Sequence, residues 1–202
     1  YGATQAFRYA VTGNPTAKAN AIAVVDTLYH HLRVTQTTGY VGRYVGPVAD
    51  PAFWLDVVGL DEGLHAEGIY TGNFYLSNSS SDQYVGFFHG LSLIYDLVDD
   101  GPTRVLIREM VQEVIDKLRS HFWLILNEDG LPTTAAPQID GGEKIAFALI
   151  AAHILDTPEY WAVYEDVFAD EAPSLGFNST GFWNRYTEYF AMNLKHQNYF
   201  NL

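Results

Sequence analysis

The chain has 202 residues, of which 48% are hydrophobic and 15% aromatic, and it contains no cysteine. This length predicts one globular domain spanning residues 1–202, and the absence of cysteine excludes disulfides and thiolate chemistry. Eleven basic and 24 acidic residues give a net charge of −13, which repels phosphate backbones, so we expect no nucleic-acid partner. No apolar run approaches the ~20 residues of a membrane span, and we expect a soluble protein, cytoplasmic or secreted.

Helix pairs separated by short turns follow one another along the chain. Residues 3–12 predict the end of a helix closed by Gly13, and Pro15 stands where the first turn of a second helix tolerates it. The same arrangement returns at Pro102 and at Pro158. The pattern predicts an all-α domain of antiparallel helical hairpins.

A long loop, residues 36–82, interrupts this pattern. It is rich in glycine and shows no sustained helical period. A connection of this length in an all-α domain is usually functional or specialised. Its segment 39–48, GYVGRYVGPV, is compatible with a short β-hairpin.

An aromatic-rich helix follows the polar cluster at residues 79–82. Its apolar residues extend well beyond one stripe, which predicts a helix buried on most sides. Gly86 and Gly90 each cost about 1 kcal/mol against Ala inside a helix, so they indicate close approach by a neighbouring helix or a ligand. His89 lies between them, and its two interpretations are a buried histidine bonded to a backbone carbonyl and a residue of a pocket.

Two stretches resemble a known class. Residues 80–84 (SSDQY), 86–88 (GFF) and 95–98 (YDLV) resemble a segment of uncharacterised bacterial proteins of the six-hairpin (α/α) toroid class. Residues 127–134 (NEDGLPTT) resemble the loop that follows it there. Many such proteins have a basic or second small residue before the aspartate, where this chain has Ser81.

The resemblance implies a function and an architecture. The class is similar to glycoside hydrolases and polysaccharide lyases, whose sites lie on loops at the mouth of the helical ring. It therefore implies a carbohydrate-active, glycosidase-like domain with a glycan ligand. A ring of six hairpins needs on the order of 300 residues, so we expect part of an (α/α) toroid whose open edge favours a homo-oligomer.

Candidate catalytic residues are acidic or histidine side chains in loops. Asp82 is the first choice, with capping of the helix as an equal alternative. Glycosidic hydrolysis needs a protonated and an ionised carboxyl group, and Asp140 is a second candidate although capping is favoured there. His65 is a candidate for acid–base chemistry or metal binding, although isolated loop histidines usually do neither. Other carboxylates considered as partners of Asp82 are Asp61, Glu62 and Glu143.

Candidate substrate-binding residues surround Asp82 in the sequence. Arg43 is expected to clamp a sugar hydroxyl or carboxylate, or to form an ion pair with Asp82. The aromatic candidates stack on sugar faces or pack in the core. The remaining candidates are Gln83, Tyr40, Trp54, Tyr70, Tyr75 and His89.

Alternative functions remain open at this level. No phosphate loop, dinucleotide fingerprint, serine elbow or zinc motif is present, and we expect no cofactor and no metal. Besides a glycosidase-like hydrolase, two alternatives are considered. One is a non-catalytic glycan-binding or homo-oligomeric assembly module, and the other is a truncated, inactive remnant of a toroid enzyme.

Overall fold

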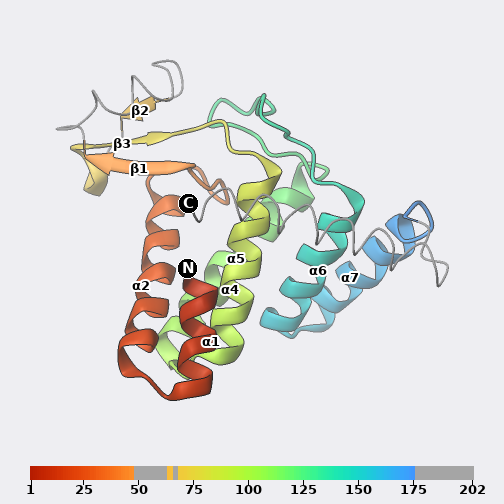
Figure 1. Cartoon of the computed structure of the whole chain (residues 1–202). Helices are drawn as coiled ribbons and strands as arrows, with labels where there is room; N and C mark the ends of the chain where they lie inside the picture. The colour runs from red at the N-terminus through yellow and green to blue at the C-terminus, as the bar shows by residue number, and fades with distance from the viewer. Residues whose placement is uncertain (48–62, 66–67, 176–202) are drawn as a thin grey trace.

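The computed structural model describes residues 1–47, 63–65 and 68–175. These residues form six α-helices and a small three-stranded sheet (Figure 1). The mainly helical character predicted from the sequence is confirmed. None of the described helices is both long enough and apolar enough to cross a membrane. The helices are α1 (Gly2–Thr12), α2 (Pro15–Arg33), α4 (Ser81–Leu97), α5 (Gly101–Ser120), α6 (Gly141–Leu155) and α7 (Pro158–Glu171).

Short turns join these helices into three pairs, α1–α2, α4–α5 and α6–α7. The Asn14 side chain accepts the N–H of Thr16 at 2.9 Å and so caps α2. Asp100 caps α5 by accepting the N–H of Thr103 at 3.1 Å and its hydroxyl at 2.7 Å. These bonds from Thr103 hold the pKa of Asp100 below its ordinary value. At the third turn, Asp156 ends α6 in the left-handed conformation, with φ 48°.

Each pair contributes one helix to each of two rows. Helices α1, α4 and α6 pack in series, and α2 packs against α5 behind them. Helix α7 packs on α6, and its Tyr160 donates to the Asp116 carboxylate of α5 at 3.1 Å. All three short turns lie at one end of the rows, and the connection 121–140 and the described part of 34–80 lie at the other, called here the long-loop end (Figure 1).

The sheet lies at the long-loop end above α2 (Figure 1). Strands β1 (Tyr44–Pro47) and β2 (Gly63–His65) each pair antiparallel with β3 (Asn73–Leu76), and the one-turn helix η2 (Gly68–Tyr70) precedes β3. The hairpin considered for residues 39–48 is therefore wrong, because β1 finds its partner about thirty residues further on. The reason is burial: β3 is the central strand of the sheet, and its Phe74, Tyr75 and Leu76 are at most 6% exposed, so it gives β1 an apolar partner.

One hydrophobic core joins the two rows. The rings of Phe88 on α4 and Phe147 on α6 stack with centroids 4.4 Å apart, and α5 adds residues such as Ile107 and Met110, both fully buried. Burial of these side chains supplies most of the driving force for folding. It also fixes the axial position of α4, and therefore the position of the loop that precedes it.

Helix α4 is not buried on all sides, which corrects the sequence-based expectation. Asp82, Gly86, His89 and Asp96 are exposed on one face, so the prediction that His89 is buried is wrong. A Cβ atom added at Gly86 or Gly90 meets no described atom within 4 Å. The opposite face of α4 packs against α1, α5 and α6, and small and polar residues lie on the exposed face. The buried residues of α4 are Tyr84, Phe87, Phe88, Leu91 and Ile94.

Candidate functional site

Three buried tyrosines from separate elements surround Glu128 at the long-loop end. Tyr40 follows α2, Tyr75 lies in β3 and Tyr84 lies near the start of α4; they are 1%, 6% and 1% exposed. Burial raises the pKa of Tyr40 and of Tyr84, and the negative charge of Glu128 acts on both in the same direction. Both hydroxyls therefore stay neutral over the physiological range.

Hydrogen bonds connect these tyrosines to the loop between α5 and α6. The Tyr40 hydroxyl accepts the N–H of Ser79 at 3.3 Å and donates to Asn127 Oδ1 at 3.2 Å. The same Asn127 oxygen accepts the N–H of Asn78 at 3.2 Å. Tyr84 accepts the N–H of Val41 at 3.4 Å. These bonds fix residue 127, and with it the neighbouring Glu128, against the chain entering α4.

Asn78 holds the second half of the same loop. Its side-chain oxygen accepts the N–H groups of Thr134 at 2.7 Å and Ala135 at 3.3 Å, and its Nδ2 donates to the Thr134 hydroxyl at 2.9 Å. Its backbone is left-handed, with φ 58°, a region that asparagine tolerates better than most residues. The clamp therefore depends on this residue type for both its side chain and its backbone.

A tight turn places Glu128 at the tip of this loop. The N–H of Gly130 donates to the Asn127 carbonyl at 3.0 Å, and the N–H of Asn127 donates to the Leu131 carbonyl at 2.8 Å. Gly130 has φ 79°, a conformation that favours glycine. A bridge between Leu126 and Pro132 closes the turn below.

The carboxyl group of Glu128 lies in a partly buried environment. It is half-buried, the Tyr75 hydroxyl hydrogen bonds to it, and its Oε1 is buried without a partner among the described residues. Burial raises the pKa of Glu128, and the nearby charge of Asp129 adds to that effect, while the bond from Tyr75 opposes it. A carboxyl held in this way keeps its proton to higher pH than an exposed one, which suits a general acid.

Asp82 lies at the same end of the molecule as Glu128. It is exposed in the first turn of α4, and the Ser80 hydroxyl donates to its Oδ1. Gln83 accepts the N–H of Ser80 at 2.8 Å and so closes the start of the helix. Asp82 is therefore not the residue that caps α4, and its carboxylate faces solvent.

Asp140 acts as a helix cap. Its side chain accepts the N–H of Glu143 at 2.8 Å, and Glu143 accepts the N–H of Asp140 at 3.0 Å. This reciprocal pair matches the role favoured from the sequence. Glu143, only 7% exposed, is likewise used within the cap.

The remaining candidates are distributed over the sheet, the long loop and α4. Arg43 is half-buried, and its N–H donates to the Leu76 carbonyl at 2.9 Å beside the sheet. The Tyr70 hydroxyl lies 3.2 Å from His30 Nδ1. His65 pairs with Phe74 across the sheet; its side chain, Trp54, Asp61 and Glu62 lie outside the described part of the structure, and His89 lies on the exposed face of α4.

Glu128 was not selected from the sequence. Residues 127–134 were identified as a loop, but nothing in the letters NEDG distinguishes a solvated carboxylate from a buried one. Glu128 lies near Tyr40, Tyr75 and Tyr84, which all precede it by more than forty residues in the chain. Only the clustering of tyrosines in the long loop was a signal, and it did not indicate which acid they enclose.

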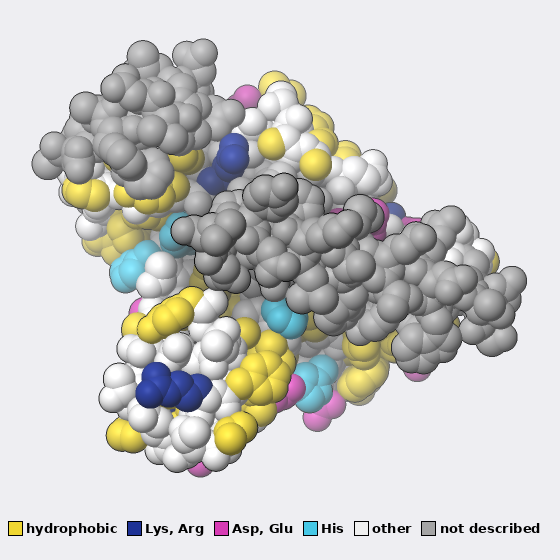
Figure 2. Space-filling view, in the orientation of Figure 1, with side chains coloured by type: hydrophobic (Ala, Val, Ile, Leu, Met, Phe, Trp, Pro, Cys, Tyr) yellow, Lys and Arg dark blue, Asp and Glu magenta, His cyan; other side chains and the backbone are white. Residues whose placement is uncertain are grey.

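The surface adds few constraints. Figure 2 shows Lys and Arg side chains scattered singly over the face drawn, without a basic patch. Within the described residues, no group of three acidic or histidine side chains is placed to hold a metal ion.

No family model matches the sequence, and comparison with curated proteins and with solved structures finds no similar protein. A functional assignment therefore depends on the geometry of the Glu128 site.

Proposed function

We propose that this chain is a glycosidase-like domain that binds a glycan at the long-loop end and cleaves it with Glu128 as the general acid. The single observation that carries the proposal is the half-buried Glu128 carboxyl, with raised pKa and a buried oxygen that has no partner among the described residues. Ionisable groups with shifted pKa values are frequent at functional sites. Burial of a polar group without a hydrogen-bond partner costs free energy and is otherwise unfavourable. The proposal extends to the architecture: the two rows of helices are part of an (α/α) ring.

The chemistry divides between two carboxyl groups. A protonated carboxyl gives its proton to the leaving glycosidic oxygen, and an ionised one activates water or attacks the sugar. Burial keeps Glu128 protonated to higher pH, so it takes the first role. Asp82 is exposed at the same end and accepts only the Ser80 hydroxyl among the described groups, so it takes the second.

The three tyrosines support the acid and do not stack on the sugar. Their burial, at 6% exposed or less, leaves no ring face open to a pyranose. Instead they exclude water from one side of Glu128, which maintains its raised pKa. Tyr75 also orients the carboxyl through its hydroxyl.

The test is hydrolysis of a panel of neutral and acidic polysaccharides by the purified chain and its variants. We expect Glu128→Gln to lower kcat by about 100-fold or more, the usual contribution of a general acid, with little change in binding. Asp82→Asn should lower kcat as well. The matched control is Glu165→Gln, the same change at an exposed glutamate of α7.

Glu128→Gln activity equal to that of the unchanged chain, on a substrate that the chain cleaves, contradicts the assignment. Equal loss in Glu165→Gln would mean that the loss does not come from the acid at residue 128, and would contradict the assignment as well. An artificial substrate with a good leaving group sharpens the test, because it needs no proton from Glu128 and should restore much of the lost rate.

A second function, glycan binding without cleavage, is favoured because few carboxylates are free to act as the partner of Glu128. Asp140 and Glu143 are consumed by the α6 cap, so Asp82 is the sole remaining partner for Glu128 among the sequence candidates whose side chains the structure describes. If the chain retains a glycan on an affinity gel and releases no reducing ends, this second function replaces the first. A light-scattering mass above one chain would add the assembly role, for which Phe7 and Val11 of α1, 50% and 83% exposed, offer apolar surface.

A further inference from the structure

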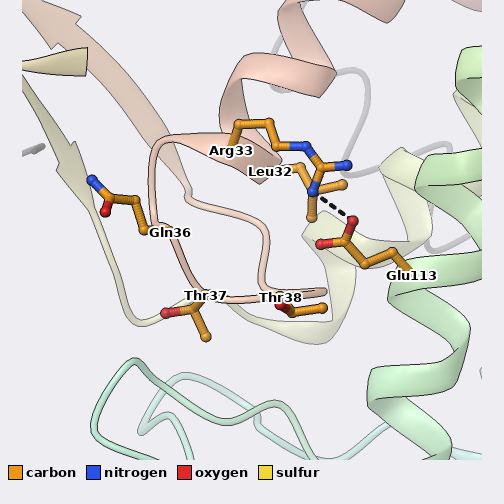
Figure 3. A pocket seen from close by; sticks show the side chains of 6 residues that line it. All are labelled: Leu32, Arg33, Gln36, Thr37, Thr38 and Glu113. Atoms are coloured by element: carbon orange, nitrogen blue, oxygen red, sulfur yellow. Dashed lines mark hydrogen bonds and ion pairs between the residues drawn. The ribbon is translucent and has the colours of Figure 1, made fainter. Parts of the chain in front are cut away.

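A pocket of about 180 Å³ opens where the end of α2 faces α5 (Figure 3). It has room for several water molecules or for one small ring. Its lining comes from the end of α2, the turn that follows it, and one residue of α5. The lining residues are Leu32, Arg33, Gln36, Thr37, Thr38 and Glu113.

The two charged groups of this pocket neutralise each other. Arg33 Nη1 donates to Glu113 Oε2 at 2.5 Å, drawn as the dashed line in Figure 3. The Arg33 guanidinium also lies 4.8 Å from the centre of the Tyr29 ring, which holds its plane in place. A paired guanidinium is a poor site for a phosphate, and a paired carboxylate is a poor site for an amine.

The turn that forms the other wall is rigid. The Thr35 hydroxyl accepts the N–H of Thr37 at 3.2 Å from inside the turn, and Thr35 is 5% exposed. The N–H of Gly39 donates to Glu113 Oε1 at 2.7 Å. Gly39 has φ 70°, and a Cβ there would lie 2.4 Å from Cβ of Lys117. The turn therefore packs directly on α5, and the pocket is already formed without a ligand.

Two uncharged polar side chains stand exposed at this pocket. Gln36 and Thr38 are exposed and make no side-chain hydrogen bond with the described residues. Gln36 also has φ 53°, a strained conformation for a residue other than glycine that is typical of functional sites. In Figure 3, Thr38 lies below the Arg33–Glu113 pair, while the Gln36 side chain points away from that pair, to the left.

We propose that this pocket binds one uncharged, polyhydroxylated ring, such as a single sugar unit. Hydroxyl groups both donate and accept, and so match the amide of Gln36, the hydroxyl of Thr38 and the outer atoms of the ion pair. The net charge of −13 disfavours an anionic ligand further. The inference goes beyond the proposed function because it assigns a second site, which neither Glu128 nor Asp82 lines.

The test is a titration of the full chain followed by NMR of its backbone amides, with D-glucose and D-xylose as probes and inorganic phosphate as the charged alternative. We expect saturable shifts at residues 36–39 with at least one sugar, and none with phosphate. Thr38→Val, which removes one hydroxyl from an exposed position, should weaken sugar binding about fivefold. Thr27→Val, at an exposed residue of α2 that does not line the pocket, should leave sugar binding unchanged.

Absence of saturable shifts at residues 36–39 with both sugars overturns the inference. So does tighter binding of phosphate, which would make the pocket an anion site. Glu128→Gln should bind the sugar as the unchanged chain does, since the acid does not line this pocket. A negative titration therefore does not affect the role proposed for Glu128, and a failure to find hydrolysis does not affect the binding proposed for this pocket.

Discussion

The two ends of the helix pairs use polar side chains for different purposes. At the short-turn end, Asn14 and Asp100 each direct their side chains at the first turn of the helix that they begin. At the long-loop end, Glu128 begins no helix and has a buried oxygen without a partner. Buried unpartnered hydroxyls occur at both ends, at Thr157 and at Thr133, so the distinguishing feature of the long-loop end is an ionisable group.

The difference shows what each end requires from the rest of the chain. A cap is satisfied by the backbone a few residues away, so the short turns form from local sequence. The environment of Glu128 involves three tyrosines that precede it by more than forty residues in the chain, and it costs stability to maintain. Costs of this kind are retained where function needs them.

The largest expected effect tests whether both ends depend on one core. Phe88→Ala removes the ring of α4 that stacks on Phe147 of α6 within the shared core, and we expect the free energy of unfolding to fall by about 3–5 kcal/mol. Urea denaturation followed by fluorescence and by circular dichroism measures it. Phe122→Ala, at a residue 85% exposed, is the control and should change little. Two separate transitions in Phe88→Ala would show that the ends unfold independently.

Asn78→Ala should act on the long-loop end alone. It removes the bonds to Thr134 and Ala135 and places a Cβ-bearing residue other than Asn at φ 58°. We expect a loss of about 2–3 kcal/mol, and faster hydrogen exchange at the amides of Thr134 and Ala135. Asn78→Gly keeps the backbone conformation without strain and should cost about 1 kcal/mol less. Unchanged exchange at residue 134 in both variants would contradict the clamp.

Much of the fold was predictable because its signals are local. Asn14 before Pro15, and Asp100 before Pro102, mark helix starts that depend on neighbours in the sequence. The pairing of β1 with β3 was not predictable in this way, because it joins residues about thirty positions apart. The interpretation of His89 as a buried residue was wrong, because the sequence of α4 shows that the helix is apolar but does not show which of its faces lacks a neighbouring helix.

Two aspartates at the long-loop end should differ in their effect on stability. Asp140→Ala breaks the cap shared with buried Glu143, and we expect a loss of about 1 kcal/mol. Asp82→Ala removes an exposed carboxylate inside the first turn of α4 and should stay within about 0.5 kcal/mol. Thermal unfolding of the two variants gives the comparison. Equal losses would mean that Asp82 also acts as a cap, which its position after Ser80 does not support.

The candidate site was predictable only in part for the same reason. The sequence placed its candidate residues in the long loop and at the start of α4, and the described parts of both lie at the long-loop end. It selected Asp82 because acids before helices are visible in a sequence. It could not select Glu128, because burial of that carboxyl arises from packing of Tyr40, Tyr75 and Tyr84 around a turn.

The smallest expected effect distinguishes the two ends by the sign of their pH dependence. Burial raises the pKa of Glu128 in the folded chain, so its stabilising contribution is complete below the ordinary pKa of glutamate and is lost as pH rises through the folded value. Bonds from Thr103 lower the pKa of Asp100, so its contribution is present above the ordinary pKa of aspartate and is lost as pH falls through the folded value.

Urea unfolding of Glu128→Gln and Asp100→Asn over a series of pH values separates these two contributions. Relative to the unchanged chain, Glu128→Gln should become more stable as pH rises from the ordinary glutamate value to the folded value, because it cannot acquire the buried charge. Asp100→Asn should be less stable than the unchanged chain above the ordinary aspartate pKa, and the gap should close in acid. A Glu128→Gln variant whose stability follows that of the unchanged chain at every pH would show that water reaches this carboxyl, and the acid role proposed for it would then lose its physical basis.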